Sequence, residues 1–226
     1  MDTQAFVAAS DLNVIIAFCG SESLPDWLTN FDCVNDLGPF PESSVHEGFQ
    51  DSLFPVLLQI ASCLRISNLQ GTKKLWLTGH SLGGALAVLL AAMFAVEKIP
   101  ICGVYTYGAP RLGNLSFAKS YDECLGDITY RLVNEGDLVP HLPPEFLGFL
   151  HCGKAILFRS DGPRMDNDNT TWTRFRESIG AWMSHIGKKD LAIRDYHLLP
   201  SPNGYLQKLE QDLDGKIVAN TFEMTI

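Results

Sequence analysis

The segment Gly79-His80-Ser81-Leu82-Gly83 places a serine between two glycines in the pattern G-x-S-x-G. A short apolar run, Lys74 to Thr78, precedes it, and a long apolar run, Leu82 to Val96, follows it. A strand, a sharp turn and a helix in this order hold a serine hydroxyl at a strained, accessible elbow. The pattern therefore predicts Ser81 as a nucleophile for acyl transfer, with the N–H of Leu82 at a helix N-terminus, where it can stabilise an oxyanion.

The same glycine-rich turn has two other interpretations. A turn between a strand and a helix can bind phosphate, but a P-loop needs Lys and Ser or Thr after its last glycine. Here Ala85 and Leu86 follow Gly84, so the sequence disfavours nucleotide binding. A plain structural turn remains the alternative to a nucleophile.

Candidates for the acid and the base follow the serine in chain order. In folds with this elbow the order is Ser, then Asp or Glu, then His. Asp137 comes after the predicted strand Ile128 to Val133, with Glu135 as its competitor. The acid would hold the tautomer of the histidine and stabilise its imidazolium form. The base that position favours is His197, in a loop before the last predicted helix, and the alternatives are His141, His151 and His185.

A second oxyanion donor is expected at the end of another strand. The predicted strand Leu12 to Phe18 ends at Cys19-Gly20-Ser21. A small residue after glycine can offer its backbone N–H, and Ser21 can add a hydroxyl, which together would complete an oxyanion hole. The alternative is a simple turn at the end of the strand.

An amphipathic helix is expected directly after this turn. Ser23 can cap it and Pro25 can begin it. Such a helix could cover an apolar cleft in water and open against lipid, and the alternative is a helix packed permanently on the core. The apolar positions at helical spacing are Leu24, Trp27, Leu28 and Phe31.

Strands and helices alternate along the whole chain, and this alternation must position the candidate residues. It predicts an α/β fold with a mostly parallel central sheet and flanking helices, whose chemistry lies beyond the carboxyl ends of the strands. The predicted strands are Gln4 to Ala8, Leu12 to Phe18, Lys74 to Thr78, Ile101 to Tyr107, Ile128 to Val133 and Lys154 to Phe158. The predicted helices are 45–66, Leu82 to Val96 and Leu115 to Leu125.

Composition limits the classes of function that remain. The 226 residues are 46% hydrophobic and 19% charged, which predicts one folded domain over 1–226 and excludes overall disorder. A net charge of −9 without a basic stripe argues against nucleic-acid binding. The longest apolar stretch, Leu82 to Val96, is too short for a transmembrane segment, which needs about 20 residues.

Two further expectations concern location and cofactors. The N-terminus has no basic region followed by a long apolar region, so no signal peptide is seen and a cytoplasmic location is expected. The six cysteines form no CxxC pair, which argues against a zinc site and favours reduced thiols. We expect no metal and no cofactor.

Several ordered motifs together resemble the class 3 lipases, the fungal-lipase-like α/β-hydrolases. The resemblance covers most of the chain and implies an α/β-hydrolase fold with a short lid helix. The motifs are Ala17-Phe18-Cys19-Gly20-Ser21, Asp26-Trp27-Leu28-Thr29-Asn30, Val45-His46-Glu47-Gly48-Phe49, Thr78 to Ala85, Tyr107 to Asn114, Val133 to Pro144 and Gly148 to His151.

The resemblance also assigns roles to residues. It implies Ser81 as nucleophile, Asp137 as acid and His197 as base. It implies the N–H groups of Ser21 and Leu82 as the oxyanion hole. The lid and substrate-binding positions that it implies are Leu24, Trp27, Leu28 and Phe31.

The chain departs from the family pattern in three places. Cys19 replaces the usual arginine before Gly20, and Asn114 replaces an aspartate-like residue. The usual N-terminal helical segment is not seen before the first strands. The expected function is a serine lipase or carboxylesterase that cleaves acyl esters of glycerolipids, with transient contact to a lipid–water interface. The alternatives are an esterase on more polar esters, such as a feruloyl esterase, a phospholipase A1, and a non-catalytic lipase-like binding or signalling module.

Overall fold

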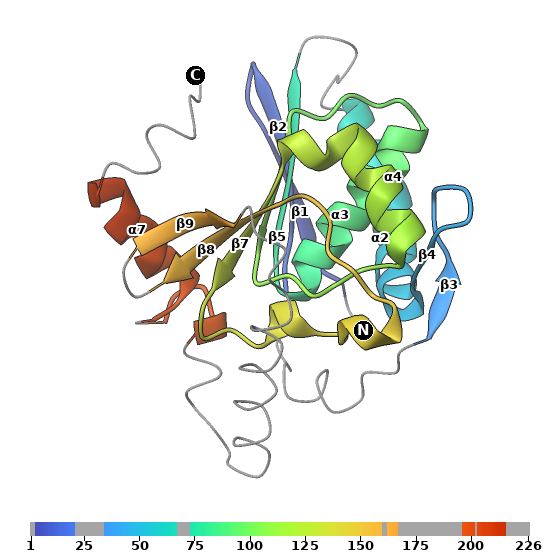
Figure 1. Cartoon of the computed structure of the whole chain (residues 1–226). Coiled ribbons are helices and arrows are strands. Elements are labelled where there is room, and N and C mark those ends of the chain that lie inside the picture. Colours follow the sequence, from blue (N-terminus) through green and yellow to red (C-terminus); the bar gives the residue numbers. More distant parts are fainter. Residues whose placement is uncertain are drawn as a thin grey trace.

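A seven-stranded sheet in the order β1-β2-β5-β6-β7-β8-β9 runs through the centre of the molecule (Figure 1). The computed structural model describes residues 3–20, 34–66, 73–159, 162–166, 196–201 and 203–215. The outer strands β1 and β9 pair antiparallel with their neighbours, and all other neighbouring strands pair parallel. The strands are β1 (Ala5–Ala9), β2 (Asn13–Phe18), β5 (Lys74–His80), β6 (Gly103–Tyr107), β7 (Thr129–Asn134), β8 (Lys154–Arg159) and β9 (Gly162–Asp166).

Helices cover both faces of this sheet. Figure 1 shows α2 (Glu47–Ile66), α3 (Leu82–Val96) and α4 (Leu115–Leu125) on one side, and α7 (Tyr205–Gly215) on the other side near β8 and β9. Helix α3 is apolar all round because Leu82 to Ala92 are all buried between the sheet and the other helices. Among the described residues, no helix is both long enough and apolar enough to cross a membrane.

Successive side chains of each strand point to opposite faces of the sheet. Val14, Ile16 and Phe18 of β2 join the main hydrophobic cluster under α2 and α3. Tyr205 and Leu209 of α7 pack in a second, smaller cluster on the opposite face. The site described below lies at the carboxyl ends of the parallel strands.

Short elements join the larger ones. A two-stranded ribbon, β3 (Asn35–Leu37) and β4 (Ser44–His46), precedes α2. Three 3-10 helices follow among the described residues of the second half of the chain. They are η1 (Gly126–Ile128), η2 (Val139–His141) and η3 (Glu145–Leu147).

The structure confirms the predicted α/β fold with a mostly parallel sheet. The expected helices Leu82 to Val96 and Leu115 to Leu125 have the predicted bounds. The helix expected over 45–66 is wrong at its start, because Val45 and His46 pair with β3 and the helix begins at Glu47. Strand β5 extends two residues past the expected Thr78, to His80.

Some expected features lie outside the described residues. They include the oxyanion residue Ser21, the alternative base His185, and the expected lid helix with Leu24, Trp27, Leu28 and Phe31.

Candidate active site

Ser81 occupies a strained turn between β5 and α3. Its φ is 57° and its ψ is −129°, and a positive φ of this kind is costly for a residue with a side chain. The backbone N–H of Ser81 donates to the carbonyl of Tyr107 at 2.9 Å, which ties the turn to the end of β6. Leu82 begins α3, so its N–H belongs to the first turn and has no partner within the helix.

The end of β2 lies against this turn. A methyl group on Gly83 would lie 2.4 Å from the carbonyl oxygen of Phe18 and 2.7 Å from that of Cys19. A methyl group on Gly20 would lie 3.1 Å from Cβ of Ser81. The absence of side chains at Gly20 and Gly83 therefore lets β2 end directly beside the serine, which is where a second oxyanion donor is needed.

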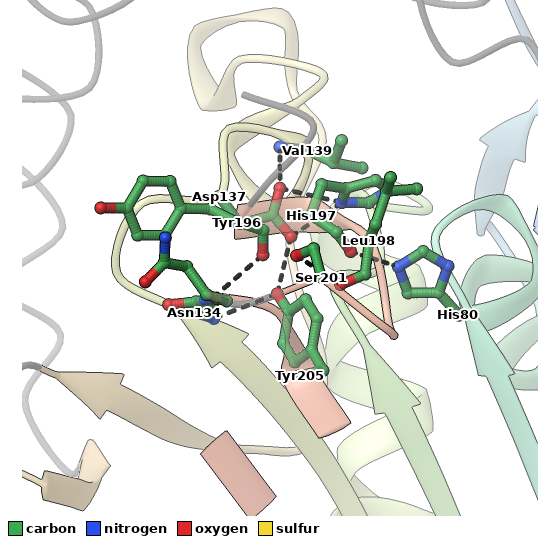
Figure 2. Close-up of polar contacts among 10 residues, drawn as sticks. His80, Asn134, Asp137, Val139, Tyr196, His197, Leu198, Ser201 and Tyr205 are labelled. Atoms are coloured by element: carbon green, nitrogen blue, oxygen red, sulfur yellow. Dashed lines mark hydrogen bonds and ion pairs between the residues drawn. The ribbon is translucent and has the colours of Figure 1, made fainter. Parts of the chain in front are cut away.

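Asp137 and His197 form a buried pair close to His80, the residue before Ser81 (Figure 2). Nδ1 of His197 donates to Asp137, at 2.8 Å from Oδ2 and 2.9 Å from Oδ1. The two side chains are only 2% and 0% exposed. A carboxylate in this place fixes the imidazole with its proton on Nδ1, so that Nε2 carries the free lone pair.

Two more groups hold the Asp137 carboxylate. The N–H of Val139 donates to Oδ1 at 3.0 Å, and the hydroxyl of Tyr205 donates to Oδ2 at 2.6 Å. Burial and the nearby Asp137 raise the pKa of Tyr205 well above its usual value, so the phenol keeps the proton that it donates. The Tyr205 oxygen also accepts the N–H of Asn134 at 3.0 Å.

The other ring nitrogen of His197, Nε2, is the candidate proton acceptor. Nε2 is buried and has no hydrogen-bond partner among the described residues, so Ser81 and His197 are not hydrogen-bonded in this state. The backbone nevertheless brings them together. Gly108 follows the carbonyl that accepts from Ser81, and a methyl group on it would lie 3.1 Å from Nδ1 of His197. Gly108 has a φ of 58°, which glycine adopts without a steric penalty.

The loop that carries His197 is fastened at both ends. Nδ2 of Asn134 donates to the carbonyls of Tyr196, at 3.0 Å, and Asn203, at 2.6 Å. Nε2 of His80 lies 2.6 Å from the carbonyl oxygen of His197 and donates to it, because a carbonyl can only accept. Strands β5 and β7 therefore both hold His197, the candidate base, in place.

The loop after Asp137 is held by a buried arginine. Nη1 of Arg111 donates to the carbonyls of His141 and Pro143, the latter at 2.9 Å, and Nη2 forms an ion pair with Glu145 at 3.3 Å. Burial lowers the pKa of Arg111, and Glu145 opposes that shift. Arg111 belongs to the Tyr107 to Asn114 motif, and these contacts explain structurally why the motif contains an arginine.

The structure separates the candidates that the sequence left open. Asp137 contacts the histidine, whereas Glu135 is exposed and donates its N–H to Phe158. His151 donates from Nε2 to the carbonyl of Pro140 at 2.6 Å, which is a structural contact. Asn114 caps α4 by accepting the N–H of Phe117 at 2.9 Å, so this departure from the family pattern keeps a helix cap.

Sequence reasoning missed three supporting residues. Asn134 and His80 lie inside motifs that the sequence analysis quoted, but their partners are more than 60 residues away in the chain. Tyr205 lies beyond the His197 loop, and nothing in its spacing indicated a contact with Asp137. In the part of the chain that the structure describes, no group of three His, Cys, Asp or Glu side chains could hold a metal ion.

Comparison with known proteins adds to this geometry. The family model for lipase (class 3) matches residues 15–147. A lipase of Rhizomucor miehei is 36% identical over 170 residues, which are 72% of this chain and 47% of the relative. The secreted mono- and diacylglycerol lipase 1 of Fusarium solani is 33% identical over 176 residues, 74% of this chain and 50% of the relative. The chain thus spans about half the length of these curated relatives.

Solved structures show the same fold. The triacylglyceride lipase of Rhizomucor miehei superposes with a TM-score of 0.64 at 34% identity, over 70% of this chain and 63% of the other. Lipase II from Rhizopus niveus gives a TM-score of 0.67 at 30% identity, over 74% and 66%. A triacylglycerol lipase described as having a serine protease triad as its catalytic centre gives 0.63 at 34% identity, over 75% and 63%.

Proposed function

Because this chain belongs to the class 3 lipase family, we propose that it hydrolyses carboxylic esters of glycerolipids through an acyl-enzyme on Ser81. One observation carries the proposal. A buried Asp137–His197 pair leaves Nε2 of His197 without a hydrogen-bond partner among the described residues, and His80, the neighbour of the strained Ser81 at the start of α3, bonds to the carbonyl of His197. This arrangement has the parts of a serine hydrolase triad.

The first half of the reaction forms the acyl-enzyme. Oγ of Ser81 attacks the ester carbonyl while Nε2 of His197 takes the hydroxyl proton. Asp137 stays ionised and stabilises the imidazolium, and the N–H groups of Leu82 and Ser21 stabilise the oxyanion. In comparable sites one such donor contributes about 2.7–4 kcal/mol to the transition state. His197 then protonates the leaving alcohol as the carbon–oxygen bond breaks.

The second half releases the acid. Water enters the place of the alcohol, His197 takes one of its protons, and the hydroxide adds to the acyl carbonyl. The new tetrahedral intermediate expels Ser81, which regains its proton from His197. The carboxylic acid leaves and the site returns to its starting state. No step of this scheme needs a group other than the residues named and water.

Hydrolysis of p-nitrophenyl esters from acetate to palmitate tests the proposal. We expect turnover by the wild type and a loss of about 10⁶-fold in kcat for Ser81→Ala. Ser52→Ala is the matched control, because this helical hydroxyl only donates to the carbonyl of Gly48 at 2.7 Å. Background rates for folded wild type on every ester would overturn the proposal and favour a non-catalytic binding module.

The chain-length profile decides between the classes of ester. A rate that rises toward long acyl chains supports a lipase, and a rate confined to acetate and butyrate supports an esterase on more polar esters. Release of the sn-1 acyl chain from a phospholipid would instead identify a phospholipase A1.

We also propose that the protein works at a lipid–water interface. Two exposed apolar side chains support this proposal, Phe146 at 72% and Leu147 at 43%, both on η3 in the chain that follows Asp137. Hydrolysis of tributyrin is the test, because the rate should increase sharply above the solubility limit of the substrate. A rate that follows dissolved substrate smoothly through that limit would contradict interfacial action.

A further inference from the structure

His80 connects the two halves of the site. It is the last residue of β5 and directly precedes Ser81, so its backbone belongs to the strand that carries the nucleophile. Its side chain reaches the loop of the base, where Nε2 donates to the carbonyl of His197 at 2.6 Å. Figure 2 shows the two rings beside each other, and their centroids are 4.5 Å apart.

The protonation state of His80 fits a fixed donor. Burial lowers the pKa of His80 to about 4, and the neighbouring His197 contributes to the shift in the same direction. The ring is therefore neutral near pH 7 and carries a single proton, which the carbonyl of His197 holds on Nε2. Nδ1 points toward the end of β2, since a methyl group on Gly20 would lie 3.3 Å from it.

The other contacts of His197 hold its ring and the preceding peptide, and they leave the peptide of His197 itself to be held by His80. Asp137 fixes the ring through Nδ1, and Asn134 fixes the preceding peptide through the carbonyl of Tyr196. The peptide of His197 itself accepts from His80. The separation between Nε2 of His197 and Oγ of Ser81 therefore depends on this bond, because it joins the strand of one to the backbone of the other.

We propose that His80 is a positioning residue, whose neutral imidazole holds the backbone of His197 at the end of β5 and thereby sets the base against the nucleophile. This inference rests on the proposed hydrolase function. His80 contacts neither the ester nor the transferred proton, so its effect is on geometry alone. A displacement of about 1 Å in such a site can cost about 100-fold in rate.

Two substitutions separate the hydrogen bond from the bulk of the side chain. His80→Gln keeps an N–H at a reach similar to that of Nε2, and His80→Leu fills the space without a donor. We expect kcat of His80→Leu on a soluble ester to fall about 10- to 100-fold with KM unchanged within about 2-fold. His80→Gln should regain most of the wild-type kcat.

Thr78→Val is the matched control on the same strand. It removes a hydroxyl that donates to the carbonyl of Tyr105 at 2.8 Å and that touches neither Ser81 nor His197. Its melting temperature should fall while its kcat stays near that of the wild type. If His80→Leu does not fold, His80→Phe supplies a ring without a donor in its place.

A measurement on the protein without substrate tests this inference independently of the hydrolase proposal. The proton on Nδ1 of His197 is held by Asp137, and its exchange with water can be followed by NMR. We expect exchange at least about 10-fold faster in His80→Leu and unchanged in His80→Gln. This readout applies even if the wild type hydrolyses no ester, which would overturn the hydrolase proposal alone.

Either of two results would overturn the role of His80. One is a His80→Leu variant with kcat within about 2-fold of the wild type and unchanged Nδ1 proton exchange. The other is a folded His80→Gln variant as impaired as His80→Leu, which would show that the hydrogen bond does not set the geometry.

Discussion

Asp137 is held more completely than any other charged side chain described in the site. Its two oxygens accept from His197, Val139 and Tyr205, and the residue is fully buried. A buried carboxylate is stable only when such donors replace the water that it has lost. Each donor therefore contributes both to the stability of the protein and to the position of the base.

Tyr205→Phe removes a single oxygen atom and tests how much one donor to Asp137 contributes. The change removes the donor to Oδ2 of Asp137 and leaves the N–H of Asn134 without its acceptor. We expect the free energy of unfolding to fall by about 1–3 kcal/mol, because a buried charge loses one of its hydrogen bonds. Urea denaturation measures that loss, and ester hydrolysis should show a decrease in kcat far smaller than that of Ser81→Ala.

The matched control is Tyr130→Phe, because Tyr130 stacks on Tyr105 with ring centroids 5.5 Å apart and lies outside the network of Asp137. Equal stability and activity of Tyr205→Phe and the wild type would show that Val139 and His197 alone satisfy the carboxylate.

Among the elements, the contact of α3 with β2 decides whether the site can form. The first turn of α3 rests on the carbonyls of Phe18 and Cys19, with no room for a side chain at Gly83. This contact determines how closely α3 approaches the sheet. It also places the N–H of Leu82 beside the end of β2.

Gly83→Ala should therefore damage both stability and catalysis. The added methyl group would lie 2.4 Å from a backbone oxygen, so β2 or α3 must move. We expect a loss of about 1–3 kcal/mol in the free energy of unfolding, as for other overpacked sites, and a lower kcat in the folded fraction. Thermal unfolding and ester hydrolysis measure the two effects.

Gly126→Ala provides the comparison. Gly126 follows α4 in an ordinary helical conformation, with φ of −56°, and its closest neighbours are side-chain atoms of Asp122 at 3.2 Å. This variant should keep its activity and change little in stability. If Gly83→Ala tolerates the methyl group equally well, the close approach of α3 and β2 is not a requirement.

The elements that the sequence predicts best are those with a long local pattern. The apolar run of α3 and the amphipathic pattern of α4 are continuous, so their bounds follow from residues close in the chain. Strand β4 was hidden because its three residues continue directly into α2, and only their pairing with β3 reveals it. Strand β9 is a short antiparallel edge with no apolar run.

The same distinction applies to the site. The pattern around Ser81 is local, and Asp137 follows a recognisable strand, so both could be proposed from the sequence. The contacts of Tyr205 with Asp137 and of His80 with His197 join residues 68 and 117 positions apart. No local pattern encodes such pairs, because they arise only when the strands lie side by side and α7 covers their far face.

For the molecule as a whole, two half-buried histidines make stability depend on pH. Burial lowers the pKa of His80 to about 4. Burial, with Arg131 and then Arg111 nearby, lowers the pKa of His151 well below 6.5. In the unfolded chain both side chains titrate near pH 6.5. Between that pH and the lower folded values, the unfolded chain binds more protons, so acid favours unfolding.

We therefore expect the free energy of unfolding to decrease as the pH falls from 7 to 5. His80 alone should contribute about 2 kcal/mol to this decrease, and His151 should act in the same direction. Urea denaturation at pH 7, 6 and 5 measures the slope. His80→Gln has no titrating group at this position, so its slope should be smaller, and equal slopes for the two proteins would contradict the assignment.

The order of Ser81, Asp137 and His197 along the chain determines when each becomes available during synthesis. Ser81 and Asp137 belong to the part of the chain that builds β5, α3 and β7, whereas His197 and Tyr205 come only after β8 and β9. Synthesis runs from the N-terminus, so a growing chain has its nucleophile long before its base. Under the proposed hydrolase function, the growing chain therefore lacks its base until the segment that follows β9 has been made.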